Sequence, residues 1–470
     1  MAPPLASPRS NCRRKAKSGS VTGNQTRKVG IDVADETQAP EQARPTSAVP
    51  LGRAVQSRIY REGLSGRRQA APTNPVALQN AAKKAVDARS WGYIQGAAGA
   101  ERTASANVAS FSKRRIIPRM LRDVSDRNLR STAIGIDFPT PLLLSPIGVL
   151  EVAHPDADLA AARAARATGT PMTVSSQASV PMEAIAEELG DTPWIFQLYW
   201  SRNDDLALSF VRRAEKAGAS AIAVTVDTHM LGWRTRDLDH GFLPFAHGMG
   251  IAQYTSDPVF QDLVDRRVAE VKPQETPRPT PQAMRALMTM AKRYPGNFRE
   301  NLRSPYPRAA VETFQEEFSR PDLTWSDLSF LREHTRLPII LKGIQHPDDA
   351  RQALDSGVDA IWVSNHGGRQ LDGAIASIDA LPGVAKVVDS AVPVIFDSGV
   401  RSGADVFRSL ALGADIVGLG RSYTYGLAVG GAEGATAVLD GFNAELDITM
   451  GLAGVSDVEN ITAECLTDAG

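Results

Sequence analysis

A histidine and an arginine, His366 and Arg369, lie three positions apart in a glycine-rich turn of the sequence. The preceding segment, Asp359 to Ser364, is mostly apolar and predicts a short buried strand. An imidazole can accept a proton near neutral pH, and a guanidinium can hold an anion. At the C-terminal mouth of a parallel barrel, both side chains would lie over a pocket, and Gly367 and Gly368 would let the backbone approach a flat ligand. The alternative is a histidine whose hydrogen bonds are satisfied within the turn.

Eight apolar segments predict the strands of such a barrel. They begin near Pro141, Pro171, Trp194, Ser220, Pro338, Asp359, Val392 and Asp415. Most intervals between them are 22 to 33 residues long, and the intervening segments, such as Leu206 to Ala217, have apolar residues at helical spacing. One strand and one helix in each interval predict an α/β fold, a (β/α)8 TIM barrel. The interval from Asp227 to Pro338 is longer and holds an insertion rich in Pro, Arg and Met at about residues 236–322.

Polar and glycine residues follow several of the predicted strands. The last two strands end in turns that combine glycine with arginine, Gly399 to Arg401 and Gly420 to Arg421, at a position where barrels commonly bind phosphate. Lys342 follows four apolar residues of strand five, either as a cation beside a cofactor or as a Schiff-base lysine. In strand three, alternation places Gln197 and Tyr199 on the same face. By themselves, the two glycine and arginine turns indicate only a phosphate-containing ligand.

The sequence Ile361 to Gly373 resembles the signature of the FMN-dependent α-hydroxy acid oxidases and dehydrogenases, the family of glycolate oxidase, lactate oxidase and lactate 2-monooxygenase. Within this family, Leu341 to Arg351 is most similar to lactate 2-monooxygenase. The resemblance implies a TIM-barrel domain over residues 71–470 with FMN as cofactor, in which the insertion of about residues 236–322 is a lid over the active site. It also implies a homo-oligomer, a tetramer or larger.

The resemblance assigns a role to individual residues. His366 would be the general base, and Lys342 would stabilise the negative charge of the reduced flavin. The residues expected to act in catalysis are His366, Tyr199, Lys342 and Arg369. The residues expected to bind the substrate are Tyr93, Arg234, Arg369 and Tyr199. The residues expected to bind FMN are Pro146, Ile147, Gly148, Ser176, Gln197, Thr225, Lys342, Ser364, Asp397, Gly399, Arg401, Gly420 and Arg421. For Tyr93, Tyr199 and Arg234, a purely structural role stays the alternative.

Two positions depart from glycolate oxidase. Gly148 replaces an alanine, as in lactate 2-monooxygenase, and leaves more room near flavin N5. Gln177 replaces a tryptophan that faces the substrate, so the size and polarity of the substrate stay open.

The implied reaction is oxidation of a small, lactate-like L-2-hydroxy acid to the 2-oxo acid with O2, with or without the oxidative decarboxylation of lactate 2-monooxygenase. The alternatives are an oxidase that produces hydrogen peroxide, a dehydrogenase with another acceptor, and an FMN barrel without net oxidation. A tailoring enzyme or binding module for a bulky or peptide substrate is a further alternative.

The composition excludes several classes of partner and site. The 52 basic and 53 acidic residues leave a net charge of −1, so no nucleic acid and no membrane partner is expected. Cys12 and Cys465 lie near the two ends, which argues against disulfides or a catalytic thiol. The sequence His346-Pro347-Asp348-Asp349 predicts a helix start, and no metal site is expected.

The first 70 residues are rich in Ala, Pro, Ser, Gln, Arg and Thr and predict a largely disordered extension. A segment within it, Ile59 to Leu64, resembles the lead-in of lactate-monooxygenase-like proteins and is expected to pack on the barrel or on a neighbouring subunit. The first 31 residues hold basic groups and no acid, so a mitochondrial targeting segment is the alternative to a cytoplasmic protein.

Overall fold

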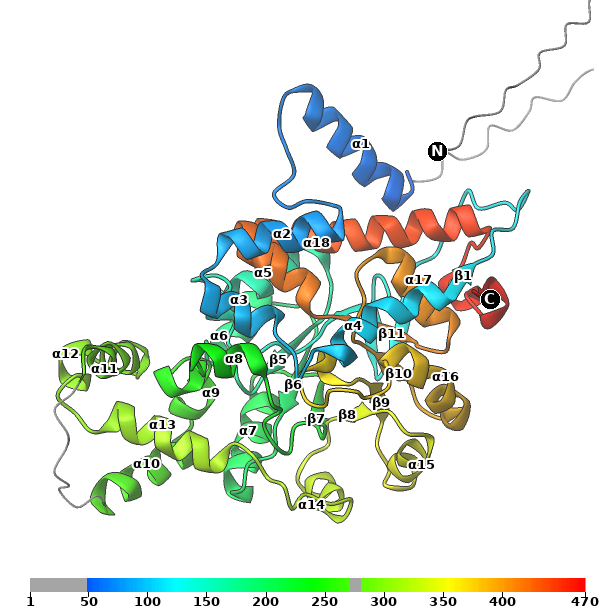
Figure 1. The fold of residues 1–470 in the computed structure, drawn as a ribbon. Coiled ribbons are helices and arrows are strands. Elements are labelled where there is room, and N and C mark those ends of the chain that lie inside the picture. Colours follow the sequence, from blue (N-terminus) through cyan, green and yellow to red (C-terminus); the bar gives the residue numbers. More distant parts are fainter. Residues whose placement is uncertain (1–48, 271–279, 470) are drawn as a thin grey trace, which may run out of the picture. The chain divides into compact units, whose positions relative to one another are not determined.

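The computed structural model describes residues 49–270 and 280–469 of the chain, and its centre is a closed barrel of eight parallel strands (Figure 1). Each barrel strand begins within two residues of its predicted start, which confirms the (β/α)8 fold. The strands are β4 (Leu142–Leu144), β5 (Met172–Ser175), β6 (Trp194–Leu198), β7 (Ala221–Thr225), β8 (Ile339–Ile344), β9 (Ala360–Val363), β10 (Val394–Phe396) and β11 (Ile416–Leu419). Every strand pairs with its neighbours in chain order, and β11 closes the barrel on β4.

Alternate residues of each strand point into the barrel, where they form a small core of their own. Ile195, Ala223, Ile340, Trp362 and Ile395 belong to this inner core and are fully buried. Because side chains alternate along a strand, the residue two positions after each of these also points inward, at the C-terminal mouth. These residues are Gln197, Thr225, Lys342, Ser364 and Asp397. The alternation thus brings five of the predicted site residues together.

The helices that follow the strands surround the barrel (Figure 1). They are α5 (Ala157–Thr168), α6 (Met182–Leu189), α7 (Asp204–Lys216), α14 (Ser326–His334), α15 (Pro347–Asp355), α16 (Ser377–Val388), α17 (Gly403–Ala411) and α18 (Arg421–Ala453). The predicted helix start at His346 is confirmed, because the His346 side chain caps α15 by accepting a hydrogen bond from the backbone N–H of Asp348.

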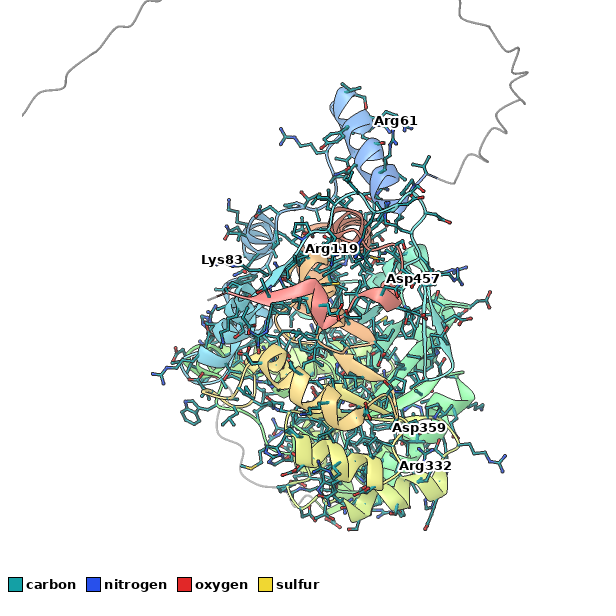
Figure 2. The ribbon with its side chains drawn as sticks, turned by 90° about the vertical axis from the view of Figure 1, so that its right-hand side faces the viewer. Arg61, Lys83, Arg119, Arg332, Asp359 and Asp457 are labelled. Carbon is teal, nitrogen blue, oxygen red and sulfur yellow. The ribbon has the colours of Figure 1, made fainter. Side chains whose placement is uncertain are left out.

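Four helices precede the barrel: α1 (Leu51–Leu64), α2 (Pro75–Ala85), α3 (Ala88–Gln95) and α4 (Arg102–Ala109). Helix α1 differs from the expectation of a largely disordered segment up to residue 70, and it is anchored on α18 by a hydrogen bond of 2.8 Å from the Gly52 N–H to Asp447 Oδ2. Its second half does not pack on the barrel, since Tyr60 and Leu64 are 72% and 91% exposed. Figure 2 shows Arg61 on the part of α1 that projects from the rest of the chain. Residues 1–48 lie outside the described residues.

The insertion between β7 and α14 is helical in its described part. It contains α8 (Thr235–His240), α9 (Ala252–Thr255), α10 (Pro258–Glu270), α11 (Pro281–Arg293), α12 (Phe298–Asn301) and α13 (Tyr306–Glu317). These helices pack around aromatic residues such as Tyr254 and Phe314, whose ring centroids are 4.8 Å apart. An ion pair of 2.5 Å between Arg293 and Glu151 ties the insertion to the loop after β4. A lid function of this insertion stays a prediction.

Two small antiparallel sheets complete the described chain. Strand β1 (Arg114–Ile116) pairs with β12 (Leu466–Asp468), and β2 (Ser131–Ala133) pairs with β3 (Ile136–Phe138). The β2–β3 hairpin contributes Phe138 to the inner core of the barrel. Of the helices in the described ranges, none has the length and apolar character needed to cross a lipid bilayer.

Candidate active site

His366 lies in a tight turn directly after β9. It has a positive φ of 58°, and Gly367 and Gly368 follow with φ values of 64° and 76°. A left-handed histidine is strained, and two hydrogen bonds hold the turn: His366 N–H donates to Ser364 Oγ at 3.0 Å, and Gly367 N–H donates to Ser398 Oγ at 3.0 Å. Glycine adopts positive φ values without steric cost, which explains why glycines follow His366 in the sequence. The turn fixes the direction of the imidazole.

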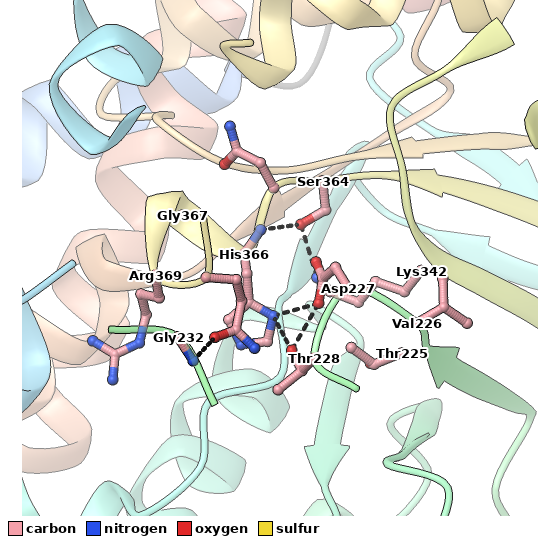
Figure 3. Close-up of polar contacts among 12 residues, drawn as sticks. Thr225, Val226, Asp227, Thr228, Gly232, Lys342, Ser364, His366, Gly367 and Arg369 are labelled. Carbon is pink, nitrogen blue, oxygen red and sulfur yellow. Dashed lines mark hydrogen bonds and ion pairs between the residues drawn. The ribbon is translucent and has the colours of Figure 1, made fainter. Parts of the chain in front are cut away.

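The imidazole of His366 is hydrogen-bonded on both sides, and Figure 3 shows the contacts on the side of Asp227 and Thr228. Its Nδ1 lies 2.8 Å from Asp227 Oδ1 and 3.1 Å from Thr228 Oγ1, and its Nε2 lies 3.3 Å from the phenol oxygen of Tyr199. A carboxylate can only accept a hydrogen bond, so Nδ1 carries the proton and Nε2 keeps its lone pair. Nε2 is therefore the basic atom of the site.

The charges around His366 favour this role. Burial lowers the pKa of His366, and the Asp227 carboxylate only partly offsets that effect, so the ring is neutral at pH 7. Burial by itself would raise the pKa of Asp227, but the charges of His366 and Lys342 outweigh it and lower this pKa to about 2. Asp227 is thus ionised throughout the physiological range, and it stabilises the imidazolium that forms when His366 accepts a proton.

Tyr199 and Tyr93 are the two predicted tyrosines of the site, and they come from different elements. Tyr199 follows β6, and its ring packs edge-to-face on Phe318 with centroids 5.5 Å apart. Burial raises the pKa of Tyr199 above its usual value, so its hydroxyl stays protonated and can donate a hydrogen bond. Tyr93 belongs to α3, and its ring lies 4.9 Å from Arg369 Cζ. Both predicted tyrosines line the pocket.

Three arginines of the pocket are bonded to carbonyl oxygens. Arg369 donates to Tyr93 O at 2.6 Å, Arg421 donates to Gly367 O at 2.9 Å, and Arg234 donates to Arg369 O at 3.3 Å. Burial lowers the pKa of Arg234 to about 10 and that of Arg421 to about 9. None of the three forms an ion pair with a carboxylate within residues 49–270 and 280–469. Arginines that line a pocket and have no carboxylate within ion-pair distance can bind an anionic ligand.

Lys342 belongs to a hydrogen-bonded network at the pocket that includes Ser364 and Asp397. Its Nζ donates to Ser364 Oγ at 2.8 Å and lies 3.4 Å from Asp397 Oδ2, and Ser364 donates to Asp397 at 2.6 Å. The ammonium also lies 5.2 Å from the centroid of the Trp362 ring. These contacts hold the ammonium in place, and Lys342 is part of the pocket lining.

One pocket brings most of the predicted residues together. Those that line it are Tyr93, Pro146, Ile147, Gly148, Tyr199, Arg234, Lys342, His366, Arg369, Asp397, Gly399, Arg401, Gly420 and Arg421.

Four predicted FMN-binding residues, Ser176, Gln197, Thr225 and Ser364, lie in a buried layer outside the lining. Within this layer Gln197 Nε2 donates to Thr225 Oγ1 at 3.0 Å, and Ser176 Oγ accepts from Tyr199 N–H at 3.2 Å. Their contacts with FMN stay predictions.

Asp227 and Thr228 were not predicted from the sequence as partners of His366. The role of Asp227 could have been predicted from its position. Asp227 follows Ala223 and Thr225 at intervals of two residues, so it also points inward, and it is the first acidic residue after β7.

The expectation of no metal site stays a prediction. In the part of the chain that the structure describes, no group of three or more His, Cys, Asp or Glu side chains is arranged to hold a metal ion.

The donors present fit FMN. Arg401 and Arg421 line the pocket beside Gly399 and Gly420, where backbone N–H groups and guanidinium groups can hold a phosphate. Arg234 and Arg369 are left for a second anion, and Lys342 supplies a fixed positive charge for a ring that becomes negative on reduction.

The comparisons agree with this fit. The family model described as FMN-dependent dehydrogenase matches residues 82–468. The FMN-dependent alpha-hydroxy acid dehydrogenase qulF of Penicillium citrinum is 37% identical over 87% of this chain and 94% of its own length. An L-lactate oxidase of Lysinibacillus sphaericus is 38% identical over 82% of this chain and 90% of its own length.

Solved structures give the same result. A Pediococcus acidilactici lactate oxidase is 33% identical, with a TM-score of 0.69, over 86% of this chain and 97% of its own length. Mandelate oxidase with (S)-4-hydroxymandelic acid is 32% identical, with a TM-score of 0.69, over 85% of this chain and 99% of its own length. The chain therefore belongs to the FMN-dependent dehydrogenase family, its cofactor is FMN, and it is an enzyme of the 2-hydroxy acid oxidases and dehydrogenases.

Proposed function

We propose that the chain oxidises a small L-2-hydroxy acid, such as lactate, to the 2-oxo acid with O2 as electron acceptor. The observation that carries this proposal is the placement of a neutral imidazole, hydrogen-bonded to Asp227, in one pocket with Arg234 and Arg369, which form no ion pair with a carboxylate among the described residues. Relatives named L-lactate oxidase and 4-hydroxymandelate oxidase support the substrate class and the use of O2.

The arginines bind and orient the substrate. A carboxylate that bridges Arg234 and Arg369 would gain charge-assisted hydrogen bonds, each worth about 1.5–3 kcal/mol, and its negative charge would balance the positive charge of the buried Arg234. The 2-hydroxyl group then lies toward His366 Nε2 and the Tyr199 hydroxyl, which are 3.3 Å apart. Tyr199 can donate a hydrogen bond to the substrate oxygen while His366 accepts from it.

Proton transfer is the task of His366. Its Nε2 accepts the hydroxyl proton of the substrate, a general-base contribution of about 10²–10⁴ in rate. Asp227 stabilises the resulting imidazolium, and Lys342 stabilises the negative charge that accumulates on the electron acceptor. When bound, FMN supplies the two-electron acceptor for the substrate and passes the electrons on to O2.

The two electrons and two protons removed from the hydroxy acid convert O2 to hydrogen peroxide. A second candidate, favoured by the similarity of Leu341 to Arg351 to lactate 2-monooxygenase, keeps the 2-oxo acid bound. There, peroxide and 2-oxo acid yield a shorter acid, carbon dioxide and water. Quantifying peroxide and carbon dioxide per turnover distinguishes the two.

The proposal is tested with the purified FMN-bound protein. Anaerobic mixing with L-lactate, L-mandelate or glycolate should bleach the flavin absorbance, and admission of air should restore it. His366→Gln should retain FMN and bleach at least about 100-fold more slowly. Absence of bleaching with every 2-hydroxy acid, or reduced protein that air does not reoxidise, would contradict the proposal and favour a bulky substrate or another acceptor.

A further inference from the structure

Gly343 forms a β-bulge in strand β8, at the C-terminal mouth of the barrel. Lys342 pairs with Trp362 of β9, and Ile344 pairs with the next residue, Val363, so Gly343 is an extra residue without a partner in β9. Its φ of 114° lies in the region that favours glycine. The sequence therefore has a glycine where the backbone of β8 departs from regular strand geometry.

The bulge reverses the direction of the Ile344 side chain. In an unbroken strand Ile344 would point into the barrel, as Ile340 and Lys342 do. Ile344 belongs instead to the large core outside the barrel, together with its partner Val363, and not to the inner core. The bulge thus keeps an isoleucine side chain out of the mouth of the barrel beside β7.

Asp227 occupies the space beside Gly343. A Cβ atom at position 343 would lie 2.8 Å from Asp227 Cβ and 3.0 Å from both its Cγ and its backbone N, closer than such contacts normally are. The two segments are held together by a hydrogen bond of 2.9 Å from the Val226 N–H to Lys342 O. A side chain at position 343 is therefore incompatible with the present position of Asp227.

Hydrogen bonds hold only one oxygen of the Asp227 carboxylate. Its Oδ1 lies 2.8 Å from His366 Nδ1 and accepts from Thr228 Oγ1 at 2.8 Å. Its Oδ2 is buried and has no hydrogen-bond partner among the described residues. The position of the carboxylate consequently depends also on the packing of Asp227 Cβ and Cγ, and Gly343 is part of that packing.

We propose that Gly343 is a positioning residue for the reaction, because its bulge admits Asp227 beside β8 and so lets the carboxylate reach His366 Nδ1. A Cβ atom at position 343 would push Asp227 away from the imidazole. The inference rests on the proposed role of His366 as the base.

The charged and titratable side chains that face the imidazole come from the loops after β6 and β7 and from β8. They are Tyr199, Asp227, Arg234 and Lys342. Asp227 is the only negative charge among these four, and it raises the pKa of His366. Displacement of Asp227 should therefore lower the pKa of His366.

The test is Gly343→Ala in the FMN-bound protein, with the 2-hydroxy acid that reduces the wild type fastest. Anaerobic flavin reduction should be slowed by at least about fivefold, and the acid limb of kcat/KM should move to lower pH by at least about 0.5 units. In an Asp227→Asn background, where the charge is already absent, the same substitution should slow reduction by less than about twofold.

Gly218→Ala is the matched control, because Gly218 also has a positive φ, of 87°, but a Cβ atom there would meet nothing within 4 Å. It imposes similar backbone strain, and it should slow reduction by less than about twofold and leave the acid limb in place.

Binding of pyruvate, followed by the flavin spectrum, supplies a readout without turnover. An imidazolium can donate a hydrogen bond to the 2-oxo group, so binding should weaken as the pH rises through the pKa of His366. In Gly343→Ala this change should occur at lower pH than in the wild type.

An acid limb that stays in place in Gly343→Ala would overturn the inference, as would equal slowing in the wild-type and Asp227→Asn backgrounds. Loss of FMN as the only defect would also overturn it, since Gly343 would then serve the cofactor through Lys342. If Gly343→Ala does not fold, it is measured in an Asp227→Gly background. Folding there would support the inference, because the nearest neighbour of the new Cβ atom is absent, and failure of both variants to fold would overturn it. These outcomes leave the proposed function intact, whereas absence of flavin reduction in the wild type with every 2-hydroxy acid would refute the proposed function itself.

Discussion

Replacing Asp227 by asparagine tests the electrostatic support of the base. The substitution keeps the shape of the side chain and its ability to accept from His366 Nδ1 at 2.8 Å, but it removes the charge. The pKa of Asp227 falls from its ordinary value of 3.8 to about 2, which at 1.36 kcal/mol per unit corresponds to about 2 kcal/mol of net stabilisation of the carboxylate. His366 is the largest of the charges that lower this pKa.

The attraction between the two groups is reciprocal, so the carboxylate also stabilises the imidazolium of His366, by an amount on the order of the 1.5–3 kcal/mol of a hydrogen bond to a charged group. Asp227→Asn should therefore slow anaerobic flavin reduction by about 30-fold. The pH profile has a defined sign as well: kcat/KM falls as His366 becomes protonated, and Asp227 raises the pKa of His366. The acid limb of the profile should consequently move to lower pH in the variant while the maximal rate decreases.

Stopped-flow flavin absorbance over a range of pH measures both effects. Thr228→Val is the matched control, because Thr228 Oγ1 also lies 3.1 Å from His366 Nδ1 but carries no charge. It should reduce the rate by less than about fivefold and leave the acid limb in place. If Asp227→Asn reduces flavin within threefold of the wild-type rate, or if its acid limb moves to higher pH, the role derived for the carboxylate is wrong.

Three further predictions follow from other parts of the site and its support. Arg421→Leu removes a buried cation from the predicted phosphate site and should weaken FMN binding by at least about 10-fold, measured as recovery of flavin fluorescence on dilution; unchanged affinity would exclude this role. Gly148→Ala should lower stability by about 1–3 kcal/mol, because the new Cβ atom would lie 2.9 Å from Gln177 Cβ. In thermal unfolding this loss should be smaller when it is measured in a Gln177→Gly background, which lacks that Cβ atom; an equal loss in both backgrounds would mean that the strain lies elsewhere. Burial raises the pKa of Asp158 from 3.8 to about 7, so the folded state binds its proton more tightly, and stability is lost as the pH rises from about 4 through 7. Asp158→Asn should therefore be increasingly stabilised relative to the wild type as the pH rises, by up to about 4 kcal/mol, and a difference in Tm that is independent of pH would contradict this.

The local pattern of apolar residues in the sequence was enough to predict the barrel and most of the pocket residues. Strands and helices have different apolar periods, so the eight strand starts could be placed from the sequence, and the residues at the C-terminal strand ends, such as Lys342 and His366, followed from the fold. The helical nature of residues 51–64 was missed, because that segment has few apolar residues and gains its order from contact of Gly52 with α18.

Only the tertiary structure decided which side chains meet. Asp227 lies 139 positions before His366, and their hydrogen bond exists because β7 and β9 flank β8 in the closed barrel. The unpaired state of the Gln177 amide likewise depends on its packing against Gly148, from the loop after the neighbouring strand. A sequence period fixes the face on which a residue lies, whereas distances between loops depend on how the strands close and how their side chains pack, and no single segment carries that information.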